Sequence, residues 1–430
     1  DGTKWKPIKT FTSNANTSFD IKGLKASLTY KFRMRAYKTF GSVTEYSDAV
    51  YLNVTTNPNT PTGMKCVAKT SSEIKLQWDK NTSADGYMID VYDGTKWKPI
   101  KTFTSNANTS YDIVGLHAGT TYKFRLRAYK AFGSVTEYSA YSAELNVTTG
   151  PSVITGAVLG GRAADALRVN WNKNTSADGY IVEMYQGKNW VSVAKITDNS
   201  TTTFRKAGLA PSTVYKFRVR AYKIDGKAEL YGNYSSMVTA RTNPSVITGA
   251  VLGGRAADAL RVNWSKNTSA DGYIVEMYQG EKWLRVAKIT DDSTTTFKKA
   301  GLDASTVYKF RVRAYKMDGT TALYGNYSST VTARTNPSVM TGVKIGGVAN
   351  DALRVNWNKN ASAQGYIIEM YQGEKWLRVA KITDNNTTTF RKAGLAKNTT
   401  YKFRVKAYYM SGKTALYGNY GSASGKTAAK

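Results

Sequence analysis

At 430 residues the chain is too long for one compact core, and its 41% hydrophobic content, with nine Trp, thirty Tyr and thirteen Phe, excludes disorder throughout. The formal charge is +31, from 61 basic and 30 acidic residues, which indicates first a solvated basic surface and second an acidic polymer or anionic surface as partner. Cys66 is the only cysteine, which excludes an intrachain disulfide, and no run of eighteen apolar residues is present that would predict a membrane-spanning helix.

A stretch that alternates apolar and basic residues recurs along the chain. It first occurs at 30–37, and it then recurs at 93-residue intervals, beginning at Tyr122, Tyr215, Tyr308 and Tyr401. In the copy at 215–222 the order is Tyr-Lys-Phe-Arg-Val-Arg-Ala-Tyr. Side chains on a β-strand point to opposite faces in turn, so the pattern predicts a strand with one core face and one basic, tyrosine-bearing face.

The repeat predicts one incomplete unit and four complete units, at 1–56, 57–149, 150–242, 243–335 and 336–430. Residues 1–11 are identical to residues 93–103, so the first unit lacks the counterpart of 57–92, which is expected to hold three strands and a core tryptophan. Two interpretations stay open. The chain is a fragment of a longer array, or the missing strands come from another molecule and produce self-association.

Within the complete unit 150–242 the alternation and turn signals predict seven strands and no helix. In chain order they lie at 153–159, 167–171, 180–185, 190–196, 201–205, 215–223 and 237–241. Seven short strands in about 93 residues predict an all-β, antiparallel sandwich. Short junctions that contain proline, as at Pro244 and Pro337, predict an elongated array of such units.

The predicted unit resembles a fibronectin type III domain. The resemblance rests on Trp171, on Tyr180-x-Val182, and on the corner at 208–215 with the alternation that follows it. It implies that the corner tyrosine bonds the backbone of the preceding loop. The implied corner tyrosines are Tyr30, Tyr122, Tyr215, Tyr308 and Tyr401. The sequence motif Ser-Ala-Asp-Gly-Tyr resembles motifs of Gram-positive bacterial surface or secreted proteins. This resemblance implies an extracellular, secreted or cell-surface location.

The sequence offers no residues for catalysis, a metal or a cofactor. His117 is the only histidine, and the other predicted units have no histidine at its position. Cys66 aligns with Leu159, so we expect it to be a small core residue. The acidic run 79–86 resembles a calcium loop but lacks the distal glutamate, which favours an Asx-type turn.

The basic face of the alternating strand is the one candidate binding surface. Glu183 on the neighbouring strand can pair with Arg218 or Arg220, and Asp90, Glu276 and Glu369 correspond to it. The face is therefore either a charge-paired structural face or a site for an anionic partner. The candidate binding residues are Arg125, Arg127, Arg218, Arg220, Tyr222, Arg311, Arg313, Tyr315, Arg404, Lys406 and Tyr408.

These features predict a non-catalytic, extracellular spacer or adhesive stalk, with cell-surface polymers, cell-wall polymers or other proteins as partners. One alternative is a polyanion- or carbohydrate-binding module that uses the basic faces. Another is an accessory segment of a larger polysaccharide-degrading enzyme. The sequence carries no nucleic-acid-binding signature, which disfavours nucleic acid as the partner.

Overall fold

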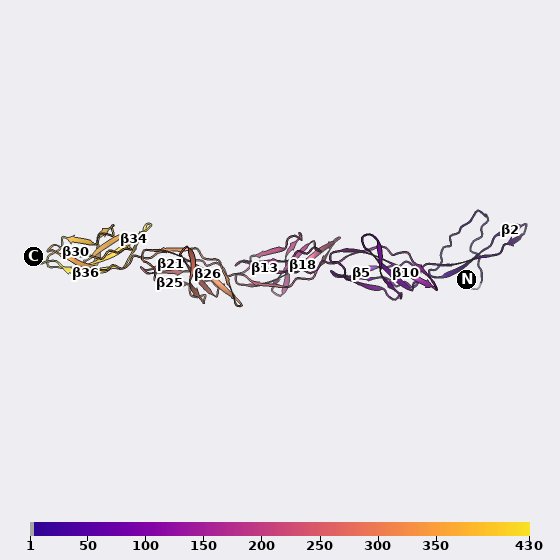
Figure 1. Cartoon of the computed structure of the whole chain (residues 1–430), viewed down its shortest axis with the longest axis horizontal. Coiled ribbons are helices and arrows are strands. Elements are labelled where there is room, and N and C mark those ends of the chain that lie inside the picture. The colour runs from indigo at the N-terminus through magenta and orange to yellow at the C-terminus, as the bar shows by residue number, and fades with distance from the viewer. Residues whose placement is uncertain (1–3) are drawn as a thin grey trace. The chain divides into compact units, whose positions relative to one another are not determined.

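The computed structural model describes residues 4–430, and every regular element in that range is a β-strand (Figure 1). The predicted all-β class is therefore confirmed. The part of the chain so described contains no apolar helix of the length that a bilayer crossing requires. The chain divides into two compact units. The first unit comprises the chain up to Ala157 together with 171–202 and 218–237. The second unit comprises 158–170, 203–217 and 238–430.

The fourth repeat, 243–335, lies entirely in the second compact unit and shows the complete sandwich. Its strands are β21 (Val251–Arg255), β22 (Ala259–Asn263), β23 (Gly272–Gln279), β24 (Lys282–Ile289), β25 (Thr296–Ala300), β26 (Val307–Asp318), β27 (Thr321–Tyr324) and β28 (Val331–Arg334). One sheet has the order β21-β22-β25. The other has the order β24-β23-β26-β27, with β28 also paired to β26. Neighbouring strands are antiparallel throughout.

The unit has eight strands, one more than the seven predicted: β28 corresponds to the last predicted strand, and β27 was not predicted. β27 pairs with the end of β26, where Tyr324 lies opposite Tyr315, and β28 pairs with its beginning, where Val331 lies opposite Phe310. The loop between β27 and β28 therefore lies beside the middle of the long strand, a position that the sequence pattern did not predict.

The two sheets of the fourth repeat enclose an apolar core. In β26 the alternation predicted from sequence places Phe310, Val312 and Ala314 inward, all fully buried. Trp264, which follows β22, is 5% exposed and its ring meets the edge of Tyr273 at a centroid distance of 5.3 Å. Burying aromatic and β-branched side chains of this size supplies most of the stability of such a sandwich.

The other complete repeats have the same succession of strands. In the second repeat they are β5 (Lys65–Lys69), β6 (Glu73–Gln77), β7 (Gly86–Tyr92), β8 (Trp97–Phe103), β9 (Ser110–Val114), β10 (Thr121–Phe132), β11 (Val135–Tyr138) and β12 (Leu145–Thr148). In the third they are β13 (Val158–Arg162), β14 (Ala166–Asn170), β15 (Gly179–Gln186), β16 (Asn189–Ile196), β17 (Thr203–Ala207), β18 (Val214–Asp225), β19 (Ala228–Tyr231) and β20 (Val238–Arg241). In the fifth they are β29 (Lys344–Val348), β30 (Ala352–Asn356), β31 (Gly365–Gln372), β32 (Lys375–Ile382), β33 (Thr389–Ala393), β34 (Thr400–Ser411), β35 (Thr414–Tyr417) and β36 (Gly421–Lys426).

The first repeat contains four strands in the described range. β1 (Thr29–Met34) pairs with β4 (Val50–Thr55), and β2 (Tyr37–Phe40) pairs with β3 (Val43–Tyr46). Several of its large apolar side chains are exposed, among them Met34 at 71%.

Candidate functional site

The outer face of the larger sheet in the fourth repeat carries a stack in which aromatic rings and guanidinium groups alternate. We call it the aromatic–arginine ladder. In this repeat its members are, in order, Trp283, Arg311, Tyr327, Arg313 and Tyr324. The arginines project from β26, Trp283 from β24 and Tyr324 from β27.

Ring-to-cation distances in the ladder are those of close stacking. The Arg311 Cζ atom lies 4.3 Å from the Trp283 ring centroid and 3.6 Å from that of Tyr327. The Arg313 Cζ atom lies 4.1 Å from the Tyr324 centroid and 4.7 Å from that of Tyr327. Cation–π contacts of this kind contribute about 0.5–2 kcal/mol each, the larger value applying where the cation is desolvated.

A buried carboxylate lies beneath the ladder. Arg311 donates to Glu276 from Nε and Nη2 at 2.9 and 2.6 Å, and the Tyr327 hydroxyl donates to the other carboxylate oxygen at 2.6 Å. Burial raises the pKa of Glu276, but the hydrogen bonds from Tyr327 and Arg311 outweigh burial and hold the pKa below its usual value. Burial and the bond to Glu276 raise the pKa of Tyr327. The acid predicted to pair with the basic face does so.

Every complete repeat has a corresponding ladder. In the second repeat it is Trp97, Arg125, Tyr141, Arg127 and Tyr138, over Asp90. In the third it is Trp190, Arg218, Tyr234, Arg220 and Tyr231, over Glu183. In the fifth it is Trp376, Arg404, Tyr420, Lys406 and Tyr417, over Glu369.

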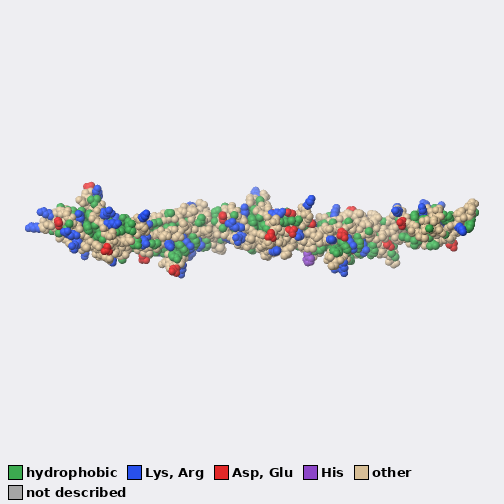
Figure 2. Space-filling model, turned by 90° about the horizontal axis from the view of Figure 1, so that it is seen from above, with side chains coloured by type: hydrophobic (Ala, Val, Ile, Leu, Met, Phe, Trp, Pro, Cys, Tyr) green, Lys and Arg blue, Asp and Glu red, His purple; other side chains and the backbone are tan. Residues whose placement is uncertain are grey.

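The cations of the ladder are largely committed to these contacts. In the fourth repeat the side chains of Arg311 and Arg313 are 25% and 26% exposed, and both lie within 4.0 Å of Glu276. The arrangement therefore fits the charge-paired structural interpretation better than an open anion site. On the face seen in Figure 2, Lys and Arg are scattered over the surface and interspersed with Asp and Glu.

Three of the predicted binding residues need a correction. The rings of Tyr222, Tyr315 and Tyr408 are 2%, 4% and 4% exposed, so they do not belong to an exposed face. Tyr315 lies opposite Gly272 in the sheet, and a Cβ atom at Gly272 would come within 3.0 Å of its ring. The missing side chain of the glycine leaves the space that the ring fills.

The middle tyrosine of each ladder was not among the predicted site residues. Tyr327 lies in the loop between β27 and β28, and its counterparts lie in the corresponding loops, outside any alternating pattern. The signal available in the sequence is a Gly-Asn-Tyr motif repeated at 232–234, 325–327 and 418–420.

The corner tyrosines have the geometry that the family resemblance implies. In the fourth repeat the Tyr308 hydroxyl accepts a hydrogen bond from the backbone amide of Asp303 at 2.9 Å. The corresponding bonds join Tyr30 to Lys25, Tyr122 to His117, Tyr215 to Ala210 and Tyr401 to Ala396, at 2.8–2.9 Å.

The residues considered for catalysis or metal binding are in structural positions. The backbone amide of His117 is used by the corner of the second repeat, and its side chain is exposed. Cys66 packs against the core of that repeat, and burial raises the pKa of its thiol. In the run 79–86 the side chain of Asn81 accepts a hydrogen bond from the amide of Ser83, which makes an Asx turn. Within residues 4–430 no group of three or more His, Cys, Asp or Glu could hold a metal ion.

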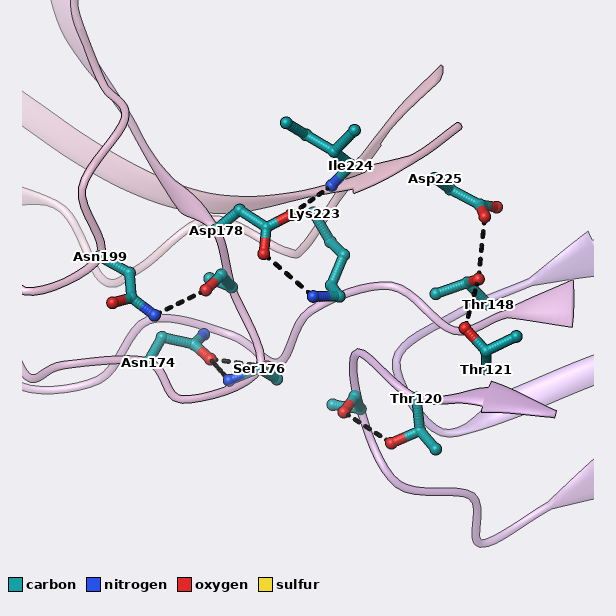
Figure 3. Close-up of polar contacts among 12 residues, drawn as sticks. Thr120, Thr121, Thr148, Asn174, Ser176, Asp178, Asn199, Lys223, Ile224 and Asp225 are labelled. Carbon is teal, nitrogen blue, oxygen red and sulfur yellow. Dashed lines mark hydrogen bonds and ion pairs between the residues drawn. The ribbon is translucent and has the colours of Figure 1, made fainter. Parts of the chain in front are cut away.

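A second candidate site lies where the third repeat meets the second, inside the first compact unit. Figure 3 shows Asp225, at the tip of the β18–β19 hairpin, pointing toward Thr148, which is itself bonded to Thr121. The Thr148 hydroxyl donates to Asp225 at 2.9 Å, and the Lys69 ammonium donates to its other oxygen at 3.0 Å. Both hydrogen bonds hold the pKa of Asp225 below its usual value, and the bond from Lys69 has the larger effect.

In the second compact unit a similar contact joins the fourth repeat to the third. Asp318, at the tip of the β26–β27 hairpin, accepts a hydrogen bond from Arg241 Nε at 3.0 Å. At the following junction Ser411 occupies the position of the acid, and the buried Nε of Arg334 has no hydrogen-bond partner. The three junctions thus differ in the residues that bind the hairpin tip, and only the last has no acid there.

Serine hydroxyls make a further contact at three junctions, those between the first and second, third and fourth, and fourth and fifth repeats. In each case the hydroxyl donates to a backbone carbonyl of the next repeat. The pairs are Ser27 with Ser83, Ser212 with Ser269, and Ser305 with Ser362. Neither these serines nor the hairpin acids were predicted from the sequence, because their partners lie 56–156 residues away.

A known family model matches parts of the second and third repeats. Residues 59–144 and 157–237 match the family model described as fibronectin type III domain. The chain is 28% identical over 290 residues to exoglucanase B of Cellulomonas fimi, an alignment that covers 63% of this chain and 25% of the relative. It is 26% identical over 418 residues to the receptor-type tyrosine-protein phosphatase eta of Gallus gallus, covering 95% of this chain and 28% of the relative.

Among solved structures, the FN1–FN3 domains of chicken CNTN1 match with 20% sequence identity and a TM-score of 0.28, covering 65% of this chain and 99% of that one. The chain spans only about a quarter of the length of the two curated relatives named above.

Proposed function

We propose that this chain, a tandem array of fibronectin type III domains, is a non-catalytic spacer that separates other parts of an extracellular or cell-surface protein. The observation that carries the proposal is the acid at the tip of the β18–β19 and β26–β27 hairpins, Asp225 and Asp318, which binds a cation of the preceding repeat. A spacer works when its junctions resist free rotation. Short linkers with charge-assisted hydrogen bonds across the junction supply that resistance.

The strength of one such contact is modest. Arg241 and Asp318 are 26% and 35% exposed, so solvent screens their attraction, and a contribution of about 1 kcal/mol is the expected order. The serine hydroxyl contact at the same junction adds a neutral hydrogen bond. Restriction therefore comes from several weak contacts acting together, and the loss of one should loosen a junction without unfolding either repeat.

The test measures junction mobility in the full chain by double electron–electron resonance between spin labels. Exposed positions on the last strands of adjacent repeats suit the labels, Thr239→Cys with Thr332→Cys, in a Cys66→Ser background. Asp318→Asn is expected to broaden the distance distribution across this junction. At the next junction, labels at Thr332→Cys and Ser424→Cys should report a narrower distribution in Ser411→Asp, because the new carboxylate can bind Arg334 Nε.

Asp258→Asn is the matched control, because it removes an exposed carboxylate from the fourth repeat away from the junction. The distance distribution between the spin labels in this variant should equal that of the parent chain. Unchanged widths in both Asp318→Asn and Ser411→Asp would contradict the spacer proposal, since its junctions would then be unrestrained by these contacts.

The match to an exoglucanase supports a second setting for the same role, an accessory segment of a polysaccharide-degrading enzyme. In that setting catalysis belongs to another part of the protein. The 430-residue chain alone should leave soluble and crystalline cellulose unhydrolysed in a reducing-sugar assay, and measurable turnover would contradict the non-catalytic proposal.

The adhesive and polyanion-binding alternatives have less support on the face predicted for them. The ladder cations are about one quarter exposed, and the rings of Tyr222, Tyr315 and Tyr408 are no more than 4% exposed. A binding role, if the chain has one, is better sought on a surface whose charges have no partner.

A further inference from the structure

The smaller sheet of the third, fourth and fifth repeats has basic residues directly opposite each other. Strand pairing places Arg168 of β14 opposite Arg205 of β17. The corresponding residues are Arg261 opposite Lys298 and Arg354 opposite Arg391. All six side chains are exposed. Directly opposed residues of an antiparallel pair have Cα atoms about 4.5–5.5 Å apart, so two positive charges are held close together in each repeat. We call these the basic pairs.

Like charges directly opposite each other destabilise a sheet. The second repeat shows that the sheet does not require them. There the same positions hold Lys75 opposite Asp112, and the two side chains form an ion pair at 3.3 Å. Three successive repeats therefore carry an unfavourable arrangement for which the same chain contains a favourable alternative.

The basic pairs have few partners within the protein. Arg168, Arg261 and Arg354 make no ion pair or hydrogen bond within residues 4–430. Arg205 reaches Asp165 only at 3.7 Å, and the two side chains are 50% and 67% exposed. This situation is the reverse of the ladder, where Arg311 is hydrogen-bonded to a buried glutamate. The positive charge available to a partner lies on the smaller sheet.

The sheet positions beside a basic pair hold small side chains, which form its floor. In the third repeat the neighbouring positions on the same face hold Gly161 and Ala207, and the Thr203 hydroxyl is bonded to Asn170 at 2.8 Å. Within residues 4–430 no aromatic ring stacks on a side chain of the basic pairs. Guanidinium groups on such a floor can reach anionic oxygens from above without a steric barrier.

We propose that the basic pairs bind an anionic polysaccharide, each pair holding one carboxylate or sulfate group of the chain. An anion between two cations removes their repulsion and gains a charge-assisted hydrogen bond from each. Three pairs on one protein add avidity, because binding at one pair raises the effective concentration at the next. The lack of a stacking ring disfavours single-stranded nucleic acid, which needs aromatic platforms. The proposal is independent of the spacer role.

The test exploits the second repeat as a template. The triple variant Arg205→Asp, Lys298→Asp and Arg391→Asp recreates the Lys75–Asp112 arrangement in all three repeats. It should therefore fold with a melting temperature no lower than that of the parent chain. Binding of the full chain to polygalacturonate and to dextran sulfate, followed by biolayer interferometry at several salt concentrations, should weaken at least tenfold in this variant, with a smaller salt dependence.

The matched control is Lys188→Asp, Lys282→Asp and Lys375→Asp, which makes the same change in net charge at exposed hairpin positions of the larger sheet in the same repeats. Its affinity should fall less than threefold. An equal loss in both triple variants would overturn the proposal, because attraction would then follow net charge and not the basic pairs. Tighter binding of duplex DNA than of either polysaccharide would also overturn it, in favour of a nucleic-acid partner.

A second variant guards against a folding defect. Arg168→Ala with Arg261→Ala and Arg354→Ala removes one cation of each pair and introduces no acid. It should weaken binding in the same direction, and retention of the parent affinity would contradict the proposal.

Discussion

The segments Trp5–Phe11 and Trp97–Phe103 share one sequence, yet the second forms β8 whereas the first, although described by the structure, lies in no strand. The difference is the partner. β8 pairs with β7 over its length, and the Phe103 side chain is 7% exposed against the core. An isolated strand leaves its backbone groups without partners, so the same residues form a strand only where a neighbouring strand supplies those bonds.

The alternating strand shows the same contrast. In β10 the core-facing residues Phe124 and Leu126 are fully buried, whereas at the corresponding position in β1 Met34 is 71% exposed. The corner bond, by contrast, is present in both repeats, from Lys25 to Tyr30 and from His117 to Tyr122 at 2.8 Å each. Contacts between residues five apart survive without the rest of the sandwich. Burial of the apolar face of the strand is lost without the rest of the sandwich.

The largest expected effect compares matched positions of these two strands. Leu126→Ala should lower the free energy of unfolding of the second repeat by about 2–5 kcal/mol, because it opens a cavity in a filled core. Met34→Ala should change stability by less than about 0.5 kcal/mol, because the side chain is already exposed. Hydrogen exchange of peptides from β10 and β1 in the full chain, measured against urea concentration, separates the two. Equal effects would show that β1 is buried as β10 is.

The sequence predicted features that depend on nearby residues or on a regular period. The inward set of β26, the core tryptophan Trp264 and the pairing of Glu276 with the basic face all follow from alternation and the order of strands. The burial of Tyr315 was not predicted because it depends on the missing side chain of Gly272 on another strand. Tyr327 was missed because it lies in the loop between β28 and β27, a strand that was not predicted. Asp318 was missed because its partner Arg241 lies 77 residues away in another repeat.

A smaller effect tests how much the acid beneath the ladder contributes. The first repeat has only the start of a ladder, Arg33 over the ring of Trp5 at 4.9 Å. The fourth has Glu276 bonded to Arg311 and Tyr327. Glu276→Gln leaves the hydrogen-bonding shape but removes the charge between two arginines, and we expect it to destabilise the fourth repeat by about 1–3 kcal/mol at pH 7.

The pH dependence of the fourth repeat provides the sharper readout. The folded-state pKa of Glu276 lies below its usual value, so the carboxylate stabilises the folded state above the ordinary glutamate pKa of about 4.3. That contribution is lost as the pH falls through the folded-state value. Hydrogen exchange of β26 peptides should therefore show less protection on acidification in the parent chain and a flatter dependence in Glu276→Gln.

The control is Glu281→Gln, which removes an exposed charge at the β23–β24 turn of the same repeat. It should keep the pH dependence of the parent chain. If the protection of Glu276→Gln depended on pH as steeply as that of the parent chain, the ladder would owe its stability to ring stacking on the arginines. The complete ladder of the fourth repeat and the partial ladder of the first would then differ only in the number of rings.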